Sequence, residues 1–396
     1  MTTLRQTIEP HRERGTLART EVVSVGDLHR QFRPERHGST RALILKMFEA
    51  VSERKPWAII LCRFKGSPPH PAEPSTEAFY RRLFEPEWDG LVEYWRDASL
   101  GAINITGSRV FDWVDVDIAR SNAGGWEQSN PKGPGRSGLV DAAIRAVLKS
   151  GDHQLDGFFS QIAVYCENWS VDNVPGAQQF AGSPFWIDGS ADKRGKVTLT
   201  PIHAGDVTAH EMGHGFGMRH DANADATEFY QDPCCIMSQS ALFQPPGWTS
   251  LFGSAICLPH LIQLDWMYKH RVLRDDGAWR SQSLGATFVL APINDPGAHA
   301  NLGIALAVGL PDDEWDYYLE YARPTGWNQG LKNNLLFIRR LRPSKIGPTA
   351  AILASLAVPA AAGDRNQLVE PKGNTRFEVQ RFGSEGRIIK VIATKL

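Results

Sequence analysis

The segment from His210 to His220 restricts the fold of this chain more than any other, because it has the pattern H-E-x-x-H-x-x-G-x-x-H. Residues four apart on an α-helix lie on the same face, about 40° apart around the axis. His210 and His214 can therefore direct their imidazole rings at one metal ion. Glu211 lies about 100° further round the same turn, where it is poorly placed as a ligand but can hydrogen-bond a water on the ion. The pattern predicts a helix that presents two ligands and a carboxylate to one metal.

The second half of the segment predicts how a third histidine reaches the same ion. Gly217 follows His214 by three residues, and glycine accepts the left-handed conformation that ends a helix in a sharp turn. His220 can then return to the metal. Three neutral histidines and one open position are typical of a catalytic zinc site, whereas structural zinc usually has four protein ligands. We therefore expect one catalytic Zn²⁺ with His210, His214 and His220 as its ligands. Glu211 is the expected general base.

The string resembles the zinc motif of the metzincin metallopeptidases, and the residues after it extend the resemblance. Asp221 is the residue type that follows the third histidine in the adamalysin-like and gametolysin-like branches. Further on, Cys235-Ile236-Met237-Ser238 is similar to the methionine turn that lies beneath the metal in this clan. The thioether of Met237 is soft and apolar, so it can pack there without competing for zinc. The resemblance implies structural roles at the site for Gly217, Asp221 and Met237.

Weaker similarities lie on both sides of the motif. Residues 57–64 and 92–107 resemble the start of gametolysin-like and immune-inhibitor-A-like bacterial enzymes, and residues 317–327 resemble their C-terminal β-region. His220 favours the gametolysin-like branch, because the other branch usually lacks the third histidine. Astacin-like and serralysin-like enzymes have a tyrosine two residues after the turn methionine, where this chain has Gln239. The residue that stabilises the oxyanion is therefore not identified from the sequence.

The resemblance implies an α+β fold, with a metzincin-type catalytic domain that contains a mixed twisted sheet, a zinc-binding active-site helix and a methionine turn. At 396 residues the chain is long enough for this domain and a second one. Residues 1–45 are rich in arginine without a clear apolar period and are interpreted as a surface leader or a pro-like segment. Residues 46–275 are assigned to the catalytic domain. Short alternating runs beyond it predict an all-β sandwich-like C-terminal domain over residues 276–396.

Apolar periodicity predicts the individual elements of the catalytic domain. The clearest helix covers residues 138–150, where Val140, Ile144 and Val147 share one face and Gly151 ends it. A shorter apolar face predicts another helix over residues 255–268. The predicted strands are residues 57–64, 158–165 and 196–202, with a strand or hairpin over residues 102–118.

The resemblance implies an endopeptidase that hydrolyses protein or peptide substrates with a metal-activated water. Two other functions are compatible with the string. One is a catalytically weak or inactive metzincin-fold protein that binds proteins or glycans, and the other is a zinc hydrolase that acts on different bonds. The complete set of expected catalytic residues favours the peptidase. One wall of the substrate pocket is expected in residues 238–251, where Phe243, Pro245 and Trp248 indicate an apolar preference.

Five cysteines leave the redox compartment open. Cys62 and Cys166 lie in predicted buried strands and are interpreted as core residues. Cys234, Cys235 and Cys257 flank the expected methionine turn. Two alternatives remain for these three residues. Cys257 could form a disulfide with Cys234 or Cys235, or all three could be free thiols.

Composition limits the partners of the chain. The formal net charge of −1 gives no reason to expect nucleic acid or an anionic membrane as a partner, and no apolar stretch is long enough to span a membrane. The resemblance implies an extracellular protein, but residues 1–15 lack the apolar core of a secretory signal peptide. Export by another route, a leader already removed, and an intracellular site are the alternatives.

Loop acids such as Asp188 and Asp192 could bind structural Ca²⁺, although no spacing typical of a calcium loop occurs. The oligomeric state is not predicted.

Overall fold

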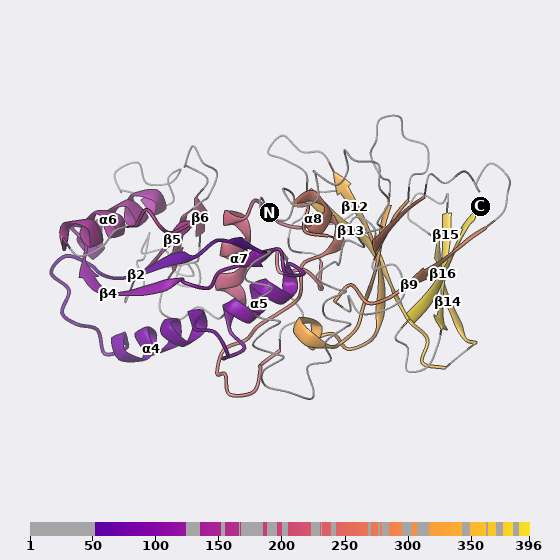
Figure 1. Cartoon of the computed structure of the whole chain (residues 1–396), viewed down its shortest axis with the longest axis horizontal. Coiled ribbons are helices and arrows are strands. Elements are labelled where there is room, and N and C mark those ends of the chain that lie inside the picture. The colour runs from indigo at the N-terminus through magenta and orange to yellow at the C-terminus, as the bar shows by residue number, and fades with distance from the viewer. Residues whose placement is uncertain are drawn as a thin grey trace, which may run out of the picture.

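The computed structural model describes most of the chain between Ser52 and Leu396 (Figure 1). The expected leader, residues 1–45, lies outside the described residues, as do Cys166, Asp188, Asp192 and Gln239. The described residues are 52–123, 135–151, 155–165, 167, 185–187, 196–199, 205–222, 230, 232–238, 243–267, 271–275, 278, 285–294, 303–306, 317–342, 349–361, 363–369, 375–382 and 388–396.

A mixed five-stranded sheet forms the centre of the N-terminal half, in the order β4-β2-β5-β7-β6. Its first four members pair in parallel, and β6 pairs with β7 antiparallel. The interior strand β2 is buried from Trp57 to Cys62, as expected for a parallel sheet that is covered on both faces. The strands are β2 (Trp57–Arg63), β4 (Arg109–Asp115), β5 (Ser160–Tyr165), β6 (Phe185–Ile187) and β7 (Lys196–Leu199).

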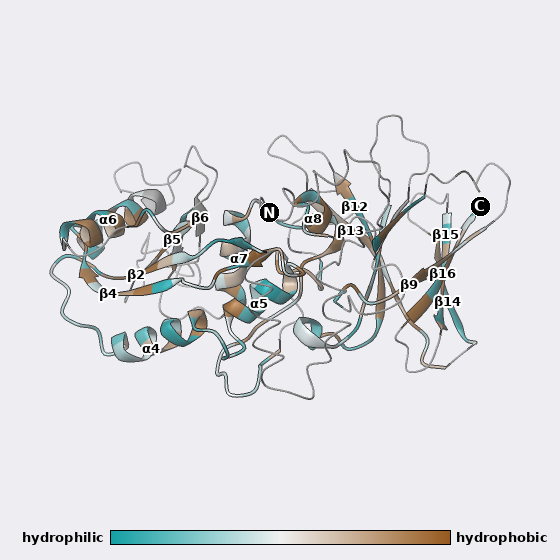
Figure 2. Ribbon diagram, viewed as in Figure 1, coloured by the Kyte–Doolittle hydropathy of each residue, from teal (hydrophilic) through white to brown (hydrophobic). Residues whose placement is uncertain are grey.

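Alternate residues of β2 face two different apolar cores. Ile59 and Leu61 pack in a large cluster with residues of α4 (Glu73–Phe84), α5 (Leu91–Ala98) and α7 (Gly205–Gly215). Ile60 packs on the opposite face with α6 (Gly135–Lys149), and Figure 2 shows both hydrophobic and hydrophilic residues on that helix. The sheet therefore separates α6 from the helix that carries the histidine motif (Figure 1).

Two further sheets lie in the C-terminal half and contribute to one apolar core. Leu319 and Ile338 from the first sheet pack with Phe377 and Val391 from the second. The first has the order β13-β12-β11-β10-β8 and the second β14-β15-β16-β9. Their strands are β8 (Val272–Asp275), β9 (Ala286–Leu290), β10 (Gly303–Leu306), β11 (Tyr317–Ala322), β12 (Leu335–Arg342), β13 (Thr349–Ala357), β14 (Arg365–Val369), β15 (Thr375–Phe382) and β16 (Ile388–Lys395).

The remaining described elements are short. Strand β1 (Glu53–Arg54) pairs in parallel with β3 (Ile103–Asn104). Two 3₁₀ turns, η1 (Arg120–Asn122) and η5 (Gly326–Asn328), lie in loops. Helix α8 (Leu258–Gln263) follows the loop that contains Met237. Among the described residues, no helix has the length and apolar character needed to cross a membrane.

The segment after the third histidine is held by the C-terminal half of the chain. Ala222 forms a parallel bridge with Ala351 of β13. The Ala222 amide donates to the carbonyl of Ala350 at 2.9 Å, and the Ala222 carbonyl accepts from the amide of Ile352 at 3.1 Å. Ile293 and Tyr318 also belong to the same core as β2 and α7. The C-terminal half therefore helps to position the residues next to the histidine motif.

The structure is a mixed α/β fold that is compatible with a metallopeptidase domain, and several predicted elements are confirmed. The helix predicted at residues 138–150 is α6, and the strand predicted at residues 196–202 is β7 over its described part. The sandwich-like C-terminal domain and its boundary at residue 276 stay predictions. Strand β8 precedes that boundary but pairs with β10 beyond it.

One predicted helix needs correction, and one observed strand is not among the predicted strands. The helix predicted over residues 255–268 covers only Leu258–Gln263. It begins there because Pro259 fits only the first turn of a helix, and the left-handed conformation of Asp265, with φ of 58°, follows its end. Strand β13 is not among the strands predicted from the sequence, and most of it is an alanine-rich run that begins at residue 350. Alanine is depleted in strands, so propensity gives no signal for this one.

Candidate metal centre and active site

Three histidines from two adjoining segments converge at one point. His210 and His214 lie on α7, and His220 lies in the extended segment after it. One ligand atom of each lies within 4.8 Å of the others. The Nε2 atoms of His214 and His220 are 2.9 Å apart, which is close to the separation of two nitrogens that share an ion at about 2.0–2.1 Å.

Backbone carbonyls orient the two helical histidines. The Nδ1 atom of His210 lies 2.7 Å from the carbonyl oxygen of Ile236, and Nδ1 of His214 lies 2.9 Å from that of Met218. An Nδ1–H group that donates to a carbonyl leaves the Nε2 lone pair for a metal and fixes the ring orientation. Both rings therefore offer Nε2 as the ligand atom.

Burial keeps the three imidazoles neutral, which is the form that binds a metal. It lowers the pKa of His210, and it lowers that of His214 well below the usual value. The pKa of His220 falls to about 3, first through burial and then through the charge of His210. A divalent cation suits this donor set, because imidazole nitrogens are the usual ligands of catalytic zinc.

Gly217 makes the turn between the second and third histidines. Its φ of +100° lies in the region that side-chain-bearing residues rarely adopt. The Gly217 amide donates to the His214 carbonyl at 2.9 Å, and the Met218 amide donates to the Gly213 carbonyl at 3.1 Å. This tight end to α7 turns the chain so that His220 returns toward the helix.

Met237 packs against the helix between its two histidines. Its side chain is fully buried, and a Cβ atom added at Gly213 would lie 2.6 Å from the Met237 sulfur. Gly213 therefore permits a contact between the helix and Met237 that a larger residue would block. The role of Met237 as an apolar floor beneath the histidines stays a prediction.

Asp221 connects three parts of the site. Its amide donates to the carbonyl of Met237 at 3.0 Å, and its carbonyl accepts from the amide of Tyr230 at 2.8 Å. Its carboxylate lies 2.7 Å from Nε2 of His260 on α8. The residue is fully buried, so it joins the histidine segment, the Met237 loop and α8 rather than facing solvent.

Two further groups accompany the histidines, and the sequence predicts only one of them. Glu211 is buried on α7 directly after His210. The hydroxyl of Tyr230 lies 2.9 Å from Nε2 of His220, on the side where the metal would bind. Burial, followed by the charge of Glu211, raises the pKa of Tyr230, so its phenol remains a proton donor at neutral pH. No motif marks Tyr230, because a separation of 10 residues from His220 implies no fixed geometry between the two side chains.

The residues expected to form the substrate pocket pack among aromatic rings. Trp248 is buried, with its ring centroid 5.9 Å from that of Phe79 and 5.1 Å from that of Phe252. Pro245 is also buried, and its carbonyl accepts from the Trp248 amide at 3.1 Å. Phe243 lies half-buried against Trp327, with ring centroids 6.1 Å apart. Their role as a pocket wall stays a prediction.

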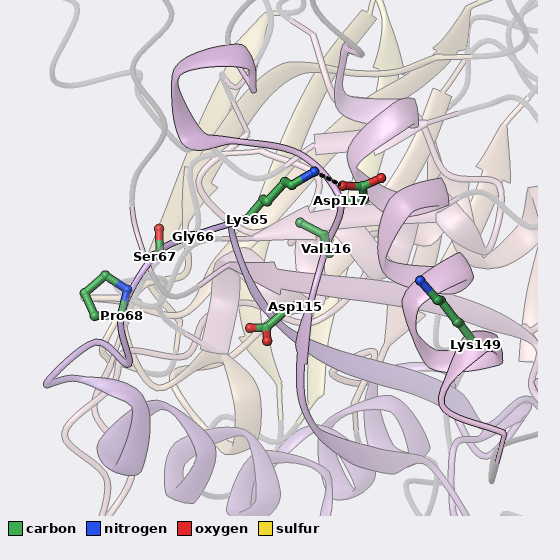
Figure 3. Close-up of a pocket in the computed structure, with 8 residues that line it drawn as sticks. All are labelled: Lys65, Gly66, Ser67, Pro68, Asp115, Val116, Asp117 and Lys149. Atoms are coloured by element: carbon green, nitrogen blue, oxygen red, sulfur yellow. Dashed lines mark hydrogen bonds and ion pairs between the residues drawn. The ribbon is translucent and has the colours of Figure 1, made fainter.

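An open pocket lies at a different place, where β2 and β4 end (Figure 3). Lys65 and Asp117 line it and form an ion pair at 2.6 Å, with Asp115 and Lys149 nearby. These side chains are the usual composition of a solvated surface. His203, which the sequence places before α7, lies outside the described residues.

Comparison with known proteins agrees with the motif. No curated protein gives a match to the chain. Residues 168–251 match the model of metallo-peptidase family M12, and this range contains the three histidines, Glu211 and Met237. The match covers the candidate site and leaves the rest of the chain unassigned. Together with the convergence of the histidines, it supports a metzincin-type metallopeptidase.

Proposed function

We propose that this protein is a zinc-dependent endopeptidase with His210, His214 and His220 as the metal ligands. The observation that carries the proposal is the convergence of three neutral imidazoles next to a buried glutamate. A catalytic site of this kind keeps one metal position for water or substrate. Peptide hydrolysis needs both this position and a general base, and Glu211 supplies the base.

Glu211 transfers the proton that hydrolysis requires. Its carboxylate accepts a proton from the attacking water as the water oxygen bonds to the peptide carbonyl carbon. The same carboxyl group then donates the proton to the amide nitrogen as the carbon–nitrogen bond breaks. When bound, Zn²⁺ would lower the pKa of its water to about 7 and polarise the carbonyl.

Tyr230 is the best-placed donor for the carbonyl oxygen. Its protonated phenol lies beside the metal-facing nitrogen of His220, so a hydrogen bond from it can stabilise the negative charge that develops on this oxygen. Gly217 and Asp221 hold the turn beneath the site, and Met237 forms its floor. None of these three transfers a proton in the proposed reaction.

The finer assignments belong to the same proposal. The chain is proposed to be a gametolysin-like metzincin with a sandwich-like C-terminal domain, and to act outside the cell on protein or peptide substrates. The third histidine supports the branch, and the shared core of the two C-terminal sheets supports the domain. The aromatic residues around Trp248 support an apolar cleavage preference.

Glu211→Gln tests the proposal. The amide keeps the size of the side chain but cannot accept the proton, so cleavage of casein or a fluorogenic peptide should fall by about 10²–10⁴-fold. Zinc content should stay unchanged, because Glu211 is not a ligand. Glu77→Gln, which alters an ion pair with Arg81 on α4, is the matched control and should keep parent activity. Equal cleavage by Glu211→Gln and the parent would show that the assignment is wrong.

A further inference from the structure

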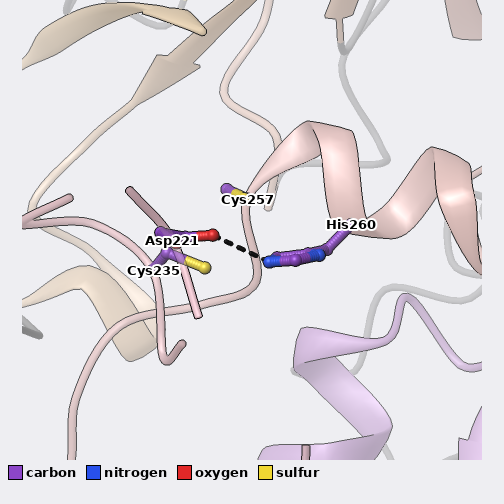
Figure 4. Close-up of side chains that lie close together, drawn as sticks. All are labelled: Asp221, Cys235, Cys257 and His260. Atoms are coloured by element: carbon purple, nitrogen blue, oxygen red, sulfur yellow. Dashed lines mark hydrogen bonds and ion pairs between the residues drawn. The ribbon is translucent and has the colours of Figure 1, made fainter. Parts of the chain in front are cut away.

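A second group of side chains with possible metal-ligand atoms lies beside the histidine site, and none of them transfers a proton in the proposed reaction. It consists of Asp221, Cys235, Cys257 and His260, which we call the Cys–His cluster. One ligand atom of each lies within 4.8 Å of the others. Figure 4 shows the four side chains directed toward one point from three stretches of chain. All four residues are fully buried.

The polar atoms of the Cys–His cluster are incompletely satisfied. The Oδ1 atom of Asp221 lies 2.7 Å from Nε2 of His260, and the sulfur atoms of Cys235 and Cys257 lie within 4.8 Å of each other. Within the described part of the chain, Oδ2 of Asp221 and Nδ1 of His260 have no hydrogen-bond partner. A buried polar atom without a partner costs about 1–3 kcal/mol, and more when it is charged. A buried carboxylate oxygen without a partner indicates a cation-binding site more directly than the cysteines alone would.

The donor set matches structural zinc. Two thiolates, one imidazole and one carboxylate complete a four-coordinate site without an open position, which is the structural type. Thiolate ligands select soft and borderline ions such as zinc over magnesium or calcium. With bonds of about 2.0–2.3 Å, the edges of a zinc tetrahedron measure roughly 3.3–3.8 Å. The ligand atoms of the cluster lie at most 4.8 Å apart. Small side-chain movements would bring them to the separations of a zinc tetrahedron.

We propose that Asp221, Cys235, Cys257 and His260 bind a second, structural Zn²⁺. Binding releases the two thiol protons, so that both sulfurs bind as thiolates, while the imidazole binds in its neutral form and the carboxylate in its ionised form. The assembled site has a formal charge of −1. Burial raises the pKa of the Cys257 thiol to about 11, and the positive charge of Arg339 opposes this rise. Arg339 therefore favours the thiolate form that binds a metal.

The second zinc would fix the base of the first site. Asp221 directly follows the ligand His220, and Cys235 lies two residues before Met237. One ion would therefore tie the third histidine, the Met237 loop and the start of α8 into one unit. This role is structural and holds whether or not the protein cleaves peptides.

A disulfide between Cys235 and Cys257 is the competing state of the same residues. Both thiols are free in the structure, and a disulfide would remove both sulfur ligands. It would leave Oδ2 of Asp221 without a partner, whereas an ion satisfies the carboxylate and the sulfurs together. Metal and disulfide exclude each other, so one set of measurements separates them.

The test uses the full chain, purified in reductant and loaded with zinc or cobalt. The parent should contain two zinc ions per chain. Cys257→Ser should contain one, while Cys234→Ser should retain two, because Cys234 contacts Asn328 outside the cluster. Cobalt-loaded parent should show the near-ultraviolet absorption of sulfur-to-cobalt charge transfer, since the three-histidine site has no sulfur ligand.

Two outcomes would overturn the proposal. One is a folded parent protein that binds a single zinc ion and shows no sulfur-to-cobalt absorption. This result would overturn the proposal whether a thiol assay finds Cys235 and Cys257 free or joined in a disulfide. The other is loss of the absorption in Cys234→Ser but not in Cys257→Ser. The cobalt spectrum of the parent decides the question even if Cys257→Ser fails to fold. Glu211→Gln should keep both metals, so failure of the peptidase assignment remains distinguishable.

Discussion

Arg339 should be one of the most sensitive positions for stability, although it lies on a C-terminal strand. Its guanidinium is fully buried on β12. It donates to the two carboxylate oxygens of Asp232 at 2.5 and 3.0 Å and to Glu320 at 2.8 Å. Asp232 in turn accepts from the amide of Cys234 at 2.9 Å. The arginine therefore joins the C-terminal sheet to the loop that carries Met237.

Arg339→Met removes the only described cation of this group and leaves two buried carboxylates. Three hydrogen bonds to charged groups are lost, each worth about 1.5–3 kcal/mol. The loss is reduced because Asp232 and Glu320 keep backbone donors, from Cys234 and Leu258. Breaking a buried ion pair from one side typically costs about 3–5 kcal/mol, and we expect a decrease of this size in the free energy of unfolding.

Urea denaturation followed by circular dichroism measures the change. Arg340→Met is the matched control, because Arg340 is the next residue on β12, half-buried with its guanidinium 5.9 Å from the ring of Tyr317. The control should lose less than about 1 kcal/mol, as for a partly exposed charge. A loss below about 1 kcal/mol in Arg339→Met as well would refute the view that Arg339 neutralises a buried acidic pair.

Three further changes have defined outcomes. Gly213→Ala places a Cβ atom 2.6 Å from the Met237 sulfur and should lower the stability measured by thermal denaturation by about 1–3 kcal/mol. The same substitution in a Met237→Ala protein should cost less, because the sulfur is absent. Equal costs in both proteins would contradict the contact. Tyr230→Phe should lower kcat by about a hundredfold with zinc content unchanged, whereas parent-like kcat would exclude the phenol from catalysis. Burial raises the pKa of Glu320 to about 7, above its unfolded value, so its contribution to stability is complete at low pH and is lost as pH rises through 7. The unfolding free energies of the parent and Glu320→Gln should therefore differ in their pH dependence between about pH 4.5 and about pH 7. Parallel profiles in this range would count against the shift.

The local part of the site could be predicted from the sequence because its geometry is helical. The spacing of His210 and His214 determines their common face, and Gly217 marks the turn that returns His220. These relations involve only a few consecutive residues. The position of Met237 was predicted from a family resemblance, and the contact with Gly213 gives it a physical reason.

The remaining features depend on contacts between distant segments. Asp221 and His260 are separated by 39 residues, and the path of the intervening chain is not encoded in any short pattern. The contact between Tyr230 and His220, 10 residues apart, is not encoded in a short pattern either. Helix α8 and strand β13 also differ from the periodicity-based prediction, because Pro259 and an alanine-rich composition weaken the local signal. Tertiary packing decided these elements.

Anomalous diffraction from crystals of the zinc-loaded protein would test the central claim most directly. The account predicts a zinc peak at about 2.0–2.1 Å from Nε2 of His210, His214 and His220 together, with the carboxylate of Glu211 directed toward its open position. A zinc-loaded crystal in which His220 faces away from the other two rings, or in which no zinc lies among them, would contradict it.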